Sequence, residues 1–376
     1  MAKFDGDLFG IRVRGNGGLR YEHTDNSIVA LDCVGCSAGL SNVTGPINHQ
    51  VTTRTYSQSY GYWLPSFLFA ADLTDKLVLR GGYYKTYVRP QPRDNVPITA
   101  LLTPDPAVAG VPTYTVNIGA TNLKPYTADS FDAALEWYNR KGGLFSIGLY
   151  QKNVKGYIGP ITDQSVLCPA SGKIDGIDVD LGTLTIDTSA GSPKCISSNK
   201  FTGSGGVLKN AEVRISGKTN QSPMTVTGLE FNIQQNLDFL PGFWKNFGGA
   251  FNYSYTKIDG KDTAGNKITL PSVSKNNLNL IGYYEAKWGG VRLVYNWRDK
   301  YDLAAGNSFV GDARTVKARS QLDASASFNL TESLTLSVDA FNLTDAQRAE
   351  YENDPMLPRF IDYDGRTYQV TMRAKF

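Results

Sequence analysis

The most constraining feature of this sequence is a period-two alternation that keeps charged side chains on one side of each segment. Near the end, Tyr368, Val370, Met372, Ala374 and Phe376 share one face, and Gln369, Thr371, Arg373 and Lys375 share the other. The same rule holds in 131–137, 291–298, 322–329 and 334–340, where Asp132, Glu136 and Arg292 fall on the polar face. Alternation of this kind predicts β-strands with two different faces.

The register of these strands decides whether the apolar face suits a lipid environment. Turning an Arg or Lys toward hydrocarbon near the membrane midplane costs up to about 2–4 kcal/mol. A few such residues would consume the stability of a typical domain, roughly 5–15 kcal/mol. The observed pattern avoids this cost and is consistent with lipid outside and water inside. A soluble antiparallel sheet also alternates, so the connections have to separate the two interpretations.

Short turns and long loops alternate along the chain. We expect about twelve strands, an antiparallel set of the kind found in outer-membrane barrels. Their ranges are 8–25, 57–71, 75–89, 127–140, 143–159, 222–238, 243–258, 272–286, 288–300, 316–330, 332–345 and 364–376. The short turns are 72–74, 141–142, 240–242, 287–289 and 331–333, and the long, extracellular loops are 26–56, 90–126, 160–221, 259–271, 301–315 and 346–363. The asymmetry predicts an all-β, antiparallel transmembrane β-barrel.

Tryptophan positions and composition agree with a barrel. Trp137, Trp244 and Trp288 lie next to short turns, and Trp63 and Trp297 lie toward long loops, as two interfacial girdles would require. No apolar stretch approaches the roughly 18 residues of a membrane helix. A net charge of only +3 predicts no nucleic-acid partner. The first ten residues lack the apolar run of a signal peptide.

The four cysteines are Cys33, Cys36, Cys168 and Cys195. A CxxC pair can bind zinc or carry redox chemistry, but a second CxxC is missing and the only histidines are His23 and His49. We therefore expect disulfides in extracytoplasmic loops, with Cys33–Cys36 and Cys168–Cys195 as candidate pairs. Four cysteines allow three pairings, and the sequence leaves them open.

Catalytic and metal sites find little support. Asp175, Asp178 and Asp180 lie close together but lack the EF-hand spacing, so a solvated acidic loop is the better interpretation. An outer-membrane hydrolase would need a nucleophile beside a base, commonly histidine, and neither His23 nor His49 has a convincing partner. We expect no enzyme, no cofactor and no metal.

Several phrases resemble TonB-dependent receptors. The closing run joins FNLTD at 341–345, a Gly-Arg-x-Tyr strand at 365–368 and a terminal Phe376. Further matches, in family order from about residue 8 to 376, are GGLRYEHTD at 17–25, LPSF at 64–67, LVLRGGYYKTYVRP at 77–90, TNLKPYTADSFDAALEWY at 121–138 and TGLEFNIQQNL at 227–237. Asn342 and Asp345 end a strand, and their side chains can bond nearby backbone.

The resemblance implies a barrel of about 22 strands with a plugged lumen. The chain would then be the C-terminal part of such a barrel, with no plug domain, and its unpaired edge near 8–25 would favour aggregation when expressed alone. The implied function is active uptake of a scarce nutrient across the outer membrane of a Gram-negative cell. An oligosaccharide, a ferric siderophore and a vitamin-like ligand stay open as cargo. The alternative is an autonomous small channel of about twelve strands.

The resemblance also implies partners: outer-membrane lipid, a TonB-type energy-coupling protein acting through the missing N-terminal region, the barrel assembly machinery and a small-molecule nutrient. The assembly signal would comprise Tyr368, Val370, Met372 and Phe376. Candidate ligand contacts are Arg89, Arg298 and Lys300 for an anionic ligand, and Tyr114 and Tyr301 for stacking on sugars.

Overall fold

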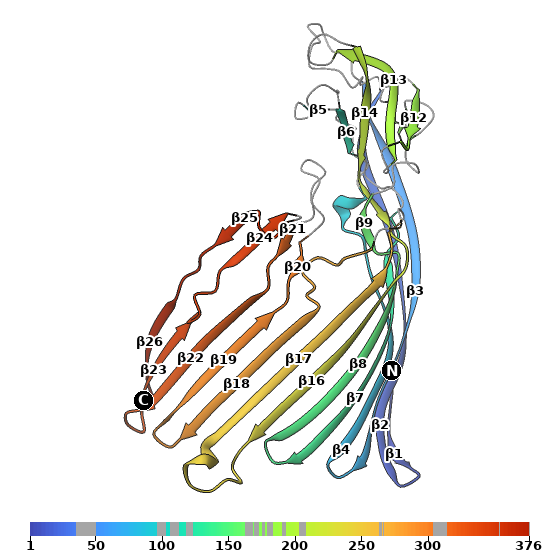
Figure 1. Cartoon of the computed structure of the whole chain (residues 1–376). Helices are drawn as coiled ribbons and strands as arrows, with labels where there is room; N and C mark the ends of the chain where they lie inside the picture. The colour runs from blue at the N-terminus through green and yellow to red at the C-terminus, as the bar shows by residue number, and fades with distance from the viewer. Residues whose placement is uncertain are drawn as a thin grey trace.

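One large antiparallel sheet, which we call the wall, organises the molecule (Figure 1). The computed structural model describes residues 1–34, 50–95, 103–105, 113–117, 123–161, 168, 173–174, 177–178, 183–189, 193–202, 208–262, 265, 267–303, 314–352 and 354–375. Among these residues no helix has the length and apolar character needed to cross a membrane. The two 3-10 helices are η2 (Pro92–Asp94) and η4 (Gly242–Asn246).

The wall has 13 strands, and neighbours in the sheet follow one another along the chain. In order they are β1 (Ala2–Leu8), β2 (Ile11–Val34), β3 (Gln50–Thr74), β4 (Leu77–Val88), β7 (Tyr126–Arg140), β8 (Gly143–Lys155), β16 (Met224–Asn236), β17 (Phe247–Gly260), β18 (Asn276–Ala286), β19 (Gly289–Arg298), β22 (Arg319–Asn329), β23 (Leu334–Phe341) and β26 (Thr367–Ala374). In Figure 1 the sheet curves from β1 to β26 without closing. The prediction of a partial antiparallel barrel is confirmed.

Strand β1 was not predicted. It pairs with β2 from Ala2–Gly17 to Leu8–Ile11, and the chain reverses at Phe9 and Gly10, both with positive φ. Its acidic residues lie opposite basic ones, and Asp5 forms an ion pair with Arg12 at 2.9 Å. The charged FDGDL sequence hides the alternation on which strand prediction depends.

Strands β2 and β3 are longer than expected. Their ladder runs without a register shift from Arg12–Asp72 to Val34–Gln50, so 26–34 and 50–56 are strand and not loop. At about 3.3 Å per residue, 26–34 adds roughly 30 Å to the hairpin. This hairpin rises beyond the rest of the wall in Figure 1.

Four small sheets lie at the long-connection end of the wall (Figure 1). One joins β12 (Leu184–Asp187), β13 (Lys194–Thr202), β14 (Leu208–Ser216), β6 (Thr113–Asn117) and β5 (Thr103–Asp105), with β14 and β6 parallel. Another joins β20 (Tyr301–Asp302), β21 (Arg314–Val316), β24 (Arg348–Glu352) and β25 (Pro358–Asp362). The pairs are β10 (Lys173–Ile174) with β11 (Ile177–Asp178), and β9 (Ile158–Pro160) with β15 (Lys218–Asn220).

No second layer of protein covers the outer face of the wall among the described residues. The fully buried apolar side chains, Leu123, Val213 and Cys195, belong to the long-connection end. Within the wall strands, the buried apolar side chains are Ala70, Ala71 and Val78, together with Met224 at the long-connection end of β16. The wall therefore lacks the hydrophobic core that a soluble sandwich would need.

Candidate functional site

The outer face of the wall is apolar and exposed. Register places Leu149 beside Ala133 and Leu229, and Leu149 remains 56% exposed. Large exposed side chains continue across the sheet: Trp63, Phe67, Phe131, Leu135, Trp137, Ile147, Leu280, Val291, Leu293, Phe328, Val338, Tyr368, Val370 and Met372. Isolated exposed apolar residues are ordinary, but a continuous surface of them marks contact with another apolar phase.

The inner face is mainly polar. One register row crosses seven strands through Glu136, Ser146, Asn232, Asn252, Asn279, Asn296 and Gln321. Asp132 and Arg292 lie on the same face, and Arg80 bonds Glu136 at 2.9 Å. Apolar Ile281 and Val294 interrupt this face. The charges therefore lie on the polar side, as the alternation predicts.

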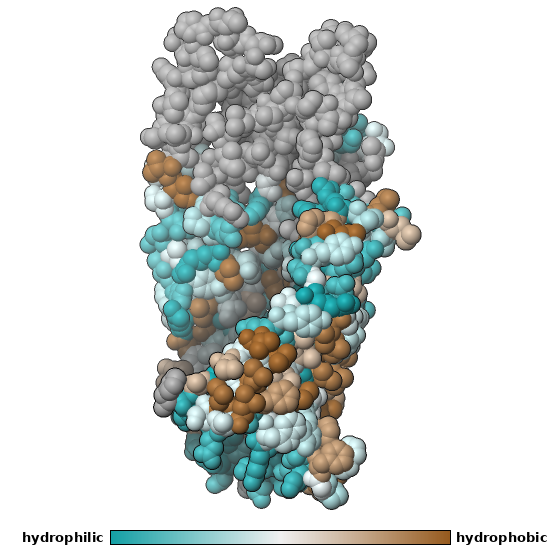
Figure 2. Space-filling model, turned by 90° about the vertical axis from the view of Figure 1, so that its left-hand side faces the viewer, coloured by the Kyte–Doolittle hydropathy of each residue, from teal (hydrophilic) through white to brown (hydrophobic). Residues whose placement is uncertain are grey.

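Aromatic rings form a chain along the short-turn end of the outer face. Successive ring centroids lie 4.3–6.0 Å apart through Phe243, Trp244, Phe247, Tyr284, Trp288 and Phe328. Trp137 and Phe145 pair further along the same end, at 5.5 Å. In the view of Figure 2, brown apolar side chains form a band above teal side chains at the base. An apolar band flanked by aromatic side chains is typical of the lipid-facing surface of an outer-membrane barrel.

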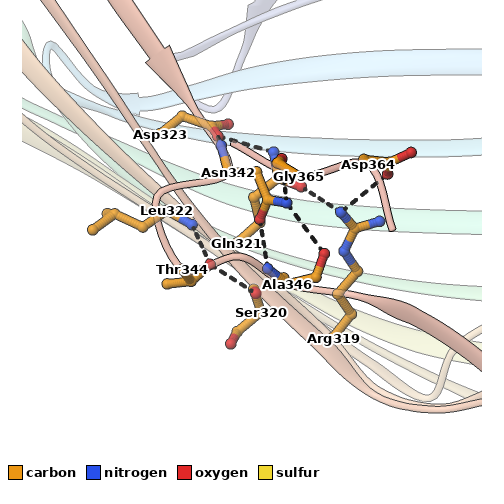
Figure 3. Close-up of polar contacts among 10 residues, drawn as sticks. All are labelled: Arg319, Ser320, Gln321, Leu322, Asp323, Asn342, Thr344, Ala346, Asp364 and Gly365. Atoms are coloured by element: carbon orange, nitrogen blue, oxygen red, sulfur yellow. Dashed lines mark hydrogen bonds and ion pairs between the residues drawn. The ribbon is translucent and has the colours of Figure 1, made fainter. Parts of the chain in front are cut away.

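A buried asparagine, Asn342, connects the long-connection ends of β22, β23 and β26, the last three wall strands (Figure 3). Asn342 follows β23 with φ of 56° and is 4% exposed. Its side-chain Nδ2 donates to the carbonyls of Gly365 at 2.9 Å and Ala346 at 3.2 Å, and Oδ1 accepts from the Ala346 N–H at 2.7 Å. Its own backbone N–H donates to Asp323 Oδ1 at 2.8 Å. We call this hydrogen-bonded cluster of Asp323, Asn342, Ala346 and Gly365 the strand-end knot. It gives a structural role to the FNLTD motif at 341–345.

A cavity of about 520 Å³ opens beside the knot, on the inner face of the wall. We call it the basic cavity. It is lined by Asn277, Asn279, Asn296, Trp297, Arg298, Tyr301, Val316, Lys317, Arg319, Gln321 and Arg348. The wall strands β18, β19 and β22 supply most of this lining. Strands β20, β21 and β24 supply Tyr301, Val316 and Arg348, and Lys317 directly follows β21.

Two of the predicted ligand contacts meet in this cavity. The Arg298 guanidinium lies over the Tyr301 ring at 3.9 Å from its centroid. Arg298 Nε donates to Ser274 Oγ at 2.6 Å, and a terminal nitrogen donates to the Ser272 carbonyl. These contacts fix the guanidinium at the cavity edge and leave other N–H groups for a ligand.

The other predicted contacts lie elsewhere. Arg89 donates to Thr24 Oγ1 and Glu22 Oε2, each at 3.1 Å, and does not line the basic cavity. Lys300 follows Arg298 in the chain but is also absent from the lining. Tyr114 lies in β6, where the structure describes the backbone alone.

Three cavity residues were missed by the sequence reasoning. Lys317 follows β21, Arg319 begins β22 and Arg348 begins β24. A signal was available for Arg319 alone, because it is a basic residue at the long-connection end of a predicted wall strand. The folding of 301–303 and 314–316 into a small sheet, which brings these residues together, has no comparable sequence signature.

Several predicted residues fall partly outside the described chain. Cys168 and Cys195 are joined by a disulfide, whereas Cys36 lies outside the described residues and Cys33 is described by its backbone alone. His49, Asp175, Asp180 and Phe376 also lie outside. Tyr368, Val370 and Met372 are each about two-thirds exposed on the outer face. In the described part of the chain, no group of His, Cys, Asp or Glu is arranged to hold a metal ion.

The described histidine makes only local contacts. His23 Nε2 lies 3.1 Å from Asp25 Oδ1 and 3.3 Å from Ser59 Oγ, near the outer end of β2. Its side chain is half exposed. This arrangement is a surface network on a strand, and His23 does not line the basic cavity.

Comparison with known proteins gives consistent matches. The family model described as TonB dependent receptor-like, beta-barrel matches residues 4–343. Hemoglobin-haptoglobin utilization protein B of Neisseria meningitidis serogroup C is 27% identical over 183 residues, 42% of this chain and 22% of that protein.

Solved structures match the whole chain at low identity. The siderophore receptor PirA of Acinetobacter baumannii has a TM-score of 0.58 at 16% identity, covering 100% of this chain and 53% of that one. The copper transporter OprC has a TM-score of 0.59 at 14% identity, covering 97% and 46%. The chain thus spans about half the length of these structures, which share its fold.

Proposed function

This chain belongs to the TonB-dependent receptor-like β-barrel family, and we propose that it forms much of the wall of an outer-membrane transporter for a scarce nutrient. The family consists of outer-membrane β-barrel receptors of Gram-negative bacteria. We place this chain in that membrane, with the short turns in the periplasm and the long connections outside.

The observation that carries the proposal is the sorting of side chains across the wall. Large apolar residues such as Leu149 and Leu280 are exposed on the outer face, and the row from Glu136 to Gln321 is polar on the inner face. In water such an outer surface would be an aggregation hazard. In a bilayer it is the surface that hydrocarbon requires, and the polar face then surrounds a hydrated lumen.

The proposed partners follow from this placement. Lipid contacts the outer face of the wall. The aromatic chain from Phe243 to Phe328 lies at the periplasmic interface of the membrane. A TonB-type energy-coupling protein drives transport. The barrel assembly machinery reads the last strand, with Tyr368, Val370, Met372 and Phe376 as its signal.

The cargo is a small-molecule nutrient. The names of similar proteins mention a siderophore, copper and hemoglobin-haptoglobin, so a metal-bearing ligand has the most support. An oligosaccharide or vitamin-like ligand remains an alternative cargo. Arg298 and Tyr301 are the proposed contacts with the best geometry, because they share the basic cavity. Arg89, Lys300 and Tyr114 would contact the ligand only at other places along the long-connection end of the wall.

An autonomous passive channel of about twelve strands is not favoured. Such a channel needs its first and last strands to pair. Among the described strands, β1 and β26 stand at opposite ends of the sheet order. The matched family consists of receptors and transporters, which likewise gives no support to an outer-membrane enzyme.

Energy dependence of uptake tests the proposal. Cells that require this protein for growth on a limiting nutrient should lose uptake of that labelled nutrient when a protonophore is added. Deletion of the energy-coupling protein should have the same effect, while the amount of receptor in the outer membrane stays unchanged. Uptake that persists under both treatments would identify a passive channel and contradict the proposal.

A further inference from the structure

We infer that the basic cavity binds a polyanionic group, a polycarboxylate or a phosphate, carried by the transported ligand. This inference rests on the proposed uptake function and specifies its ligand chemistry. It assigns Lys317, Arg319 and Arg348, together with Arg298, as the residues that recognise the ligand.

The charge of the lining is the first argument. Of the described residues, four cationic side chains line the cavity and no carboxylate does. Among the described residues, the structure records no ion pair for Arg298 or Lys317. Four cations around one space repel one another, and a multiply charged anion that enters the cavity would be attracted by all four.

Nearby carboxylates neutralise this charge only in part. Glu350 is 4% exposed and serves two guanidinium groups, Arg348 at 2.6 Å and Arg314 at 3.6 Å. One carboxylate between two guanidinium groups leaves a positive charge. Asp364 lies 3.5 Å from Arg319, but its side chain is 60% exposed, so solvent weakens this ion pair.

Other acids at this end of the wall are turned to different partners. Asp299 accepts a hydrogen bond from Asn276 at 2.9 Å, and Asp302 accepts one from Thr315 at 2.9 Å. Asp323 accepts from the Asn342 backbone and from Gln321. None of these three carboxylates lines the cavity.

The position of Arg319 is the second argument. A terminal nitrogen of Arg319 donates to Gln321 Oε1 at 3.1 Å, and Gln321 Nε2 donates to Asp323 Oδ1 at 2.9 Å. Asp323 in turn accepts from Asn342, so a chain of hydrogen bonds connects the strand-end knot to the cavity. Arg319 Nε is buried without a hydrogen-bond partner. Because its neighbours already hold the guanidinium in place, Arg319 can bind an oxyanion through its terminal nitrogens without first being ordered.

The neutral part of the lining fits the same ligand class. Asn279 and Asn296 offer amide donors for further oxygens, and Tyr301 adds ring surface. A volume of about 520 Å³ lies in the usual range for a small-molecule site. An uncharged oligosaccharide would leave the four cations without counter-charges, so it fits less well.

The test measures equilibrium binding of defined probes to the complete protein purified from outer membranes in detergent. Citrate and inorganic pyrophosphate are the polyanionic probes, and maltotriose is the neutral one. At low salt both polyanions should bind saturably with Kd below about 1 mM, and maltotriose should not. Arg319→Gln should weaken binding about tenfold, and the more exposed Lys317→Gln about threefold.

The matched control is Lys287→Gln. It removes one exposed cation from the short turn between β18 and β19, at the opposite end of these strands from the cavity. It should leave both Kd values unchanged. Should Arg319→Gln fail to fold, Lys317→Gln carries the test, because its side chain is exposed. The inference is overturned if neither polyanion binds below about 10 mM, or if Lys287→Gln weakens binding as much as the cavity variants. Energy-dependent uptake would survive that result, so the two proposals fail separately.

Discussion

Replacing Leu149 by arginine should destabilise the wall by about 2–4 kcal/mol, the usual cost of an arginine facing lipid near the midplane. Leu149 is 56% exposed on the outer face of β8. It lies four residues from Phe145, whose ring pairs with Trp137 at the short-turn girdle. At about 3.3 Å per residue and a tilt near 45°, this places Leu149 roughly 10 Å into an apolar band roughly 25 Å tall.

The matched control is Ser146→Arg on the same strand. Register places Ser146 on the inner face between Glu136 and Asn232. An arginine there would enter water beside a carboxylate, so the free energy of unfolding should change by less than about 0.5 kcal/mol. The two variants add the same side chain three residues apart and differ in the face that receives it.

The assay is reversible urea unfolding of the complete protein in phospholipid vesicles, followed by tryptophan fluorescence. Leu149→Arg should shift the folding equilibrium by roughly 30- to 700-fold, since each 1.4 kcal/mol is a factor of ten. Equal destabilisation by both variants, or a Leu149→Arg protein as stable as the parent, would refute the assignment of the outer face to lipid.

Three further predictions concern local structure. Asn342→Gly relieves the positive φ but loses three side-chain hydrogen bonds, so the free energy of unfolding should fall by about 1.5–3 kcal/mol. A variant as stable as the wild type would show that these hydrogen bonds do not stabilise the strand ends. Cys168→Ser opens a disulfide that spans 27 residues, a local loss of about 3–4 kcal/mol, and should speed proteolysis within 160–221 without moving the unfolding midpoint of the wall. Gly289→Ala should cost more than about 2 kcal/mol in a thermal melt, because φ is 149° and the new Cβ would lie 1.9 Å from the Ser327 carbonyl oxygen. Gly282→Ala, with open space around it, should be close to neutral and serves as its control.

The wall could be predicted from the sequence because one physical demand acts on every strand. Lipid excludes charge from one face, so residues such as Asp132 and Glu136 report the register wherever a strand crosses. The demand disappears outside the membrane. There the ladder of β2 and β3 continues through 26–34, where neither face has to be apolar and alternation is lost.

The candidate site was only half predictable for a related reason. Arg298 ends a clear wall strand and Tyr301 follows it by three residues, so their position at the long-connection end of that strand could be inferred. Lys317 and Arg348 reach the cavity through pairing of β21 with β24 across more than thirty residues. Pairing of polar segments in connections depends on the fold that encloses them, and propensity does not specify it. The parallel contact of β14 with β6 is equally invisible to the sequence.

The unbroken register of β2 and β3 limits how related sequences can change in length. Inserting or deleting one residue between 12 and 25 would rotate every later side chain of the strand to the opposite face, exchanging Tyr21 for a polar neighbour such as Glu22. Connections such as 160–221 do not face lipid, so a change of register there turns no charge toward hydrocarbon. Homologous genes should therefore gain and lose codons freely in the connections, while the crossing segments keep a constant number of residues over long evolutionary times.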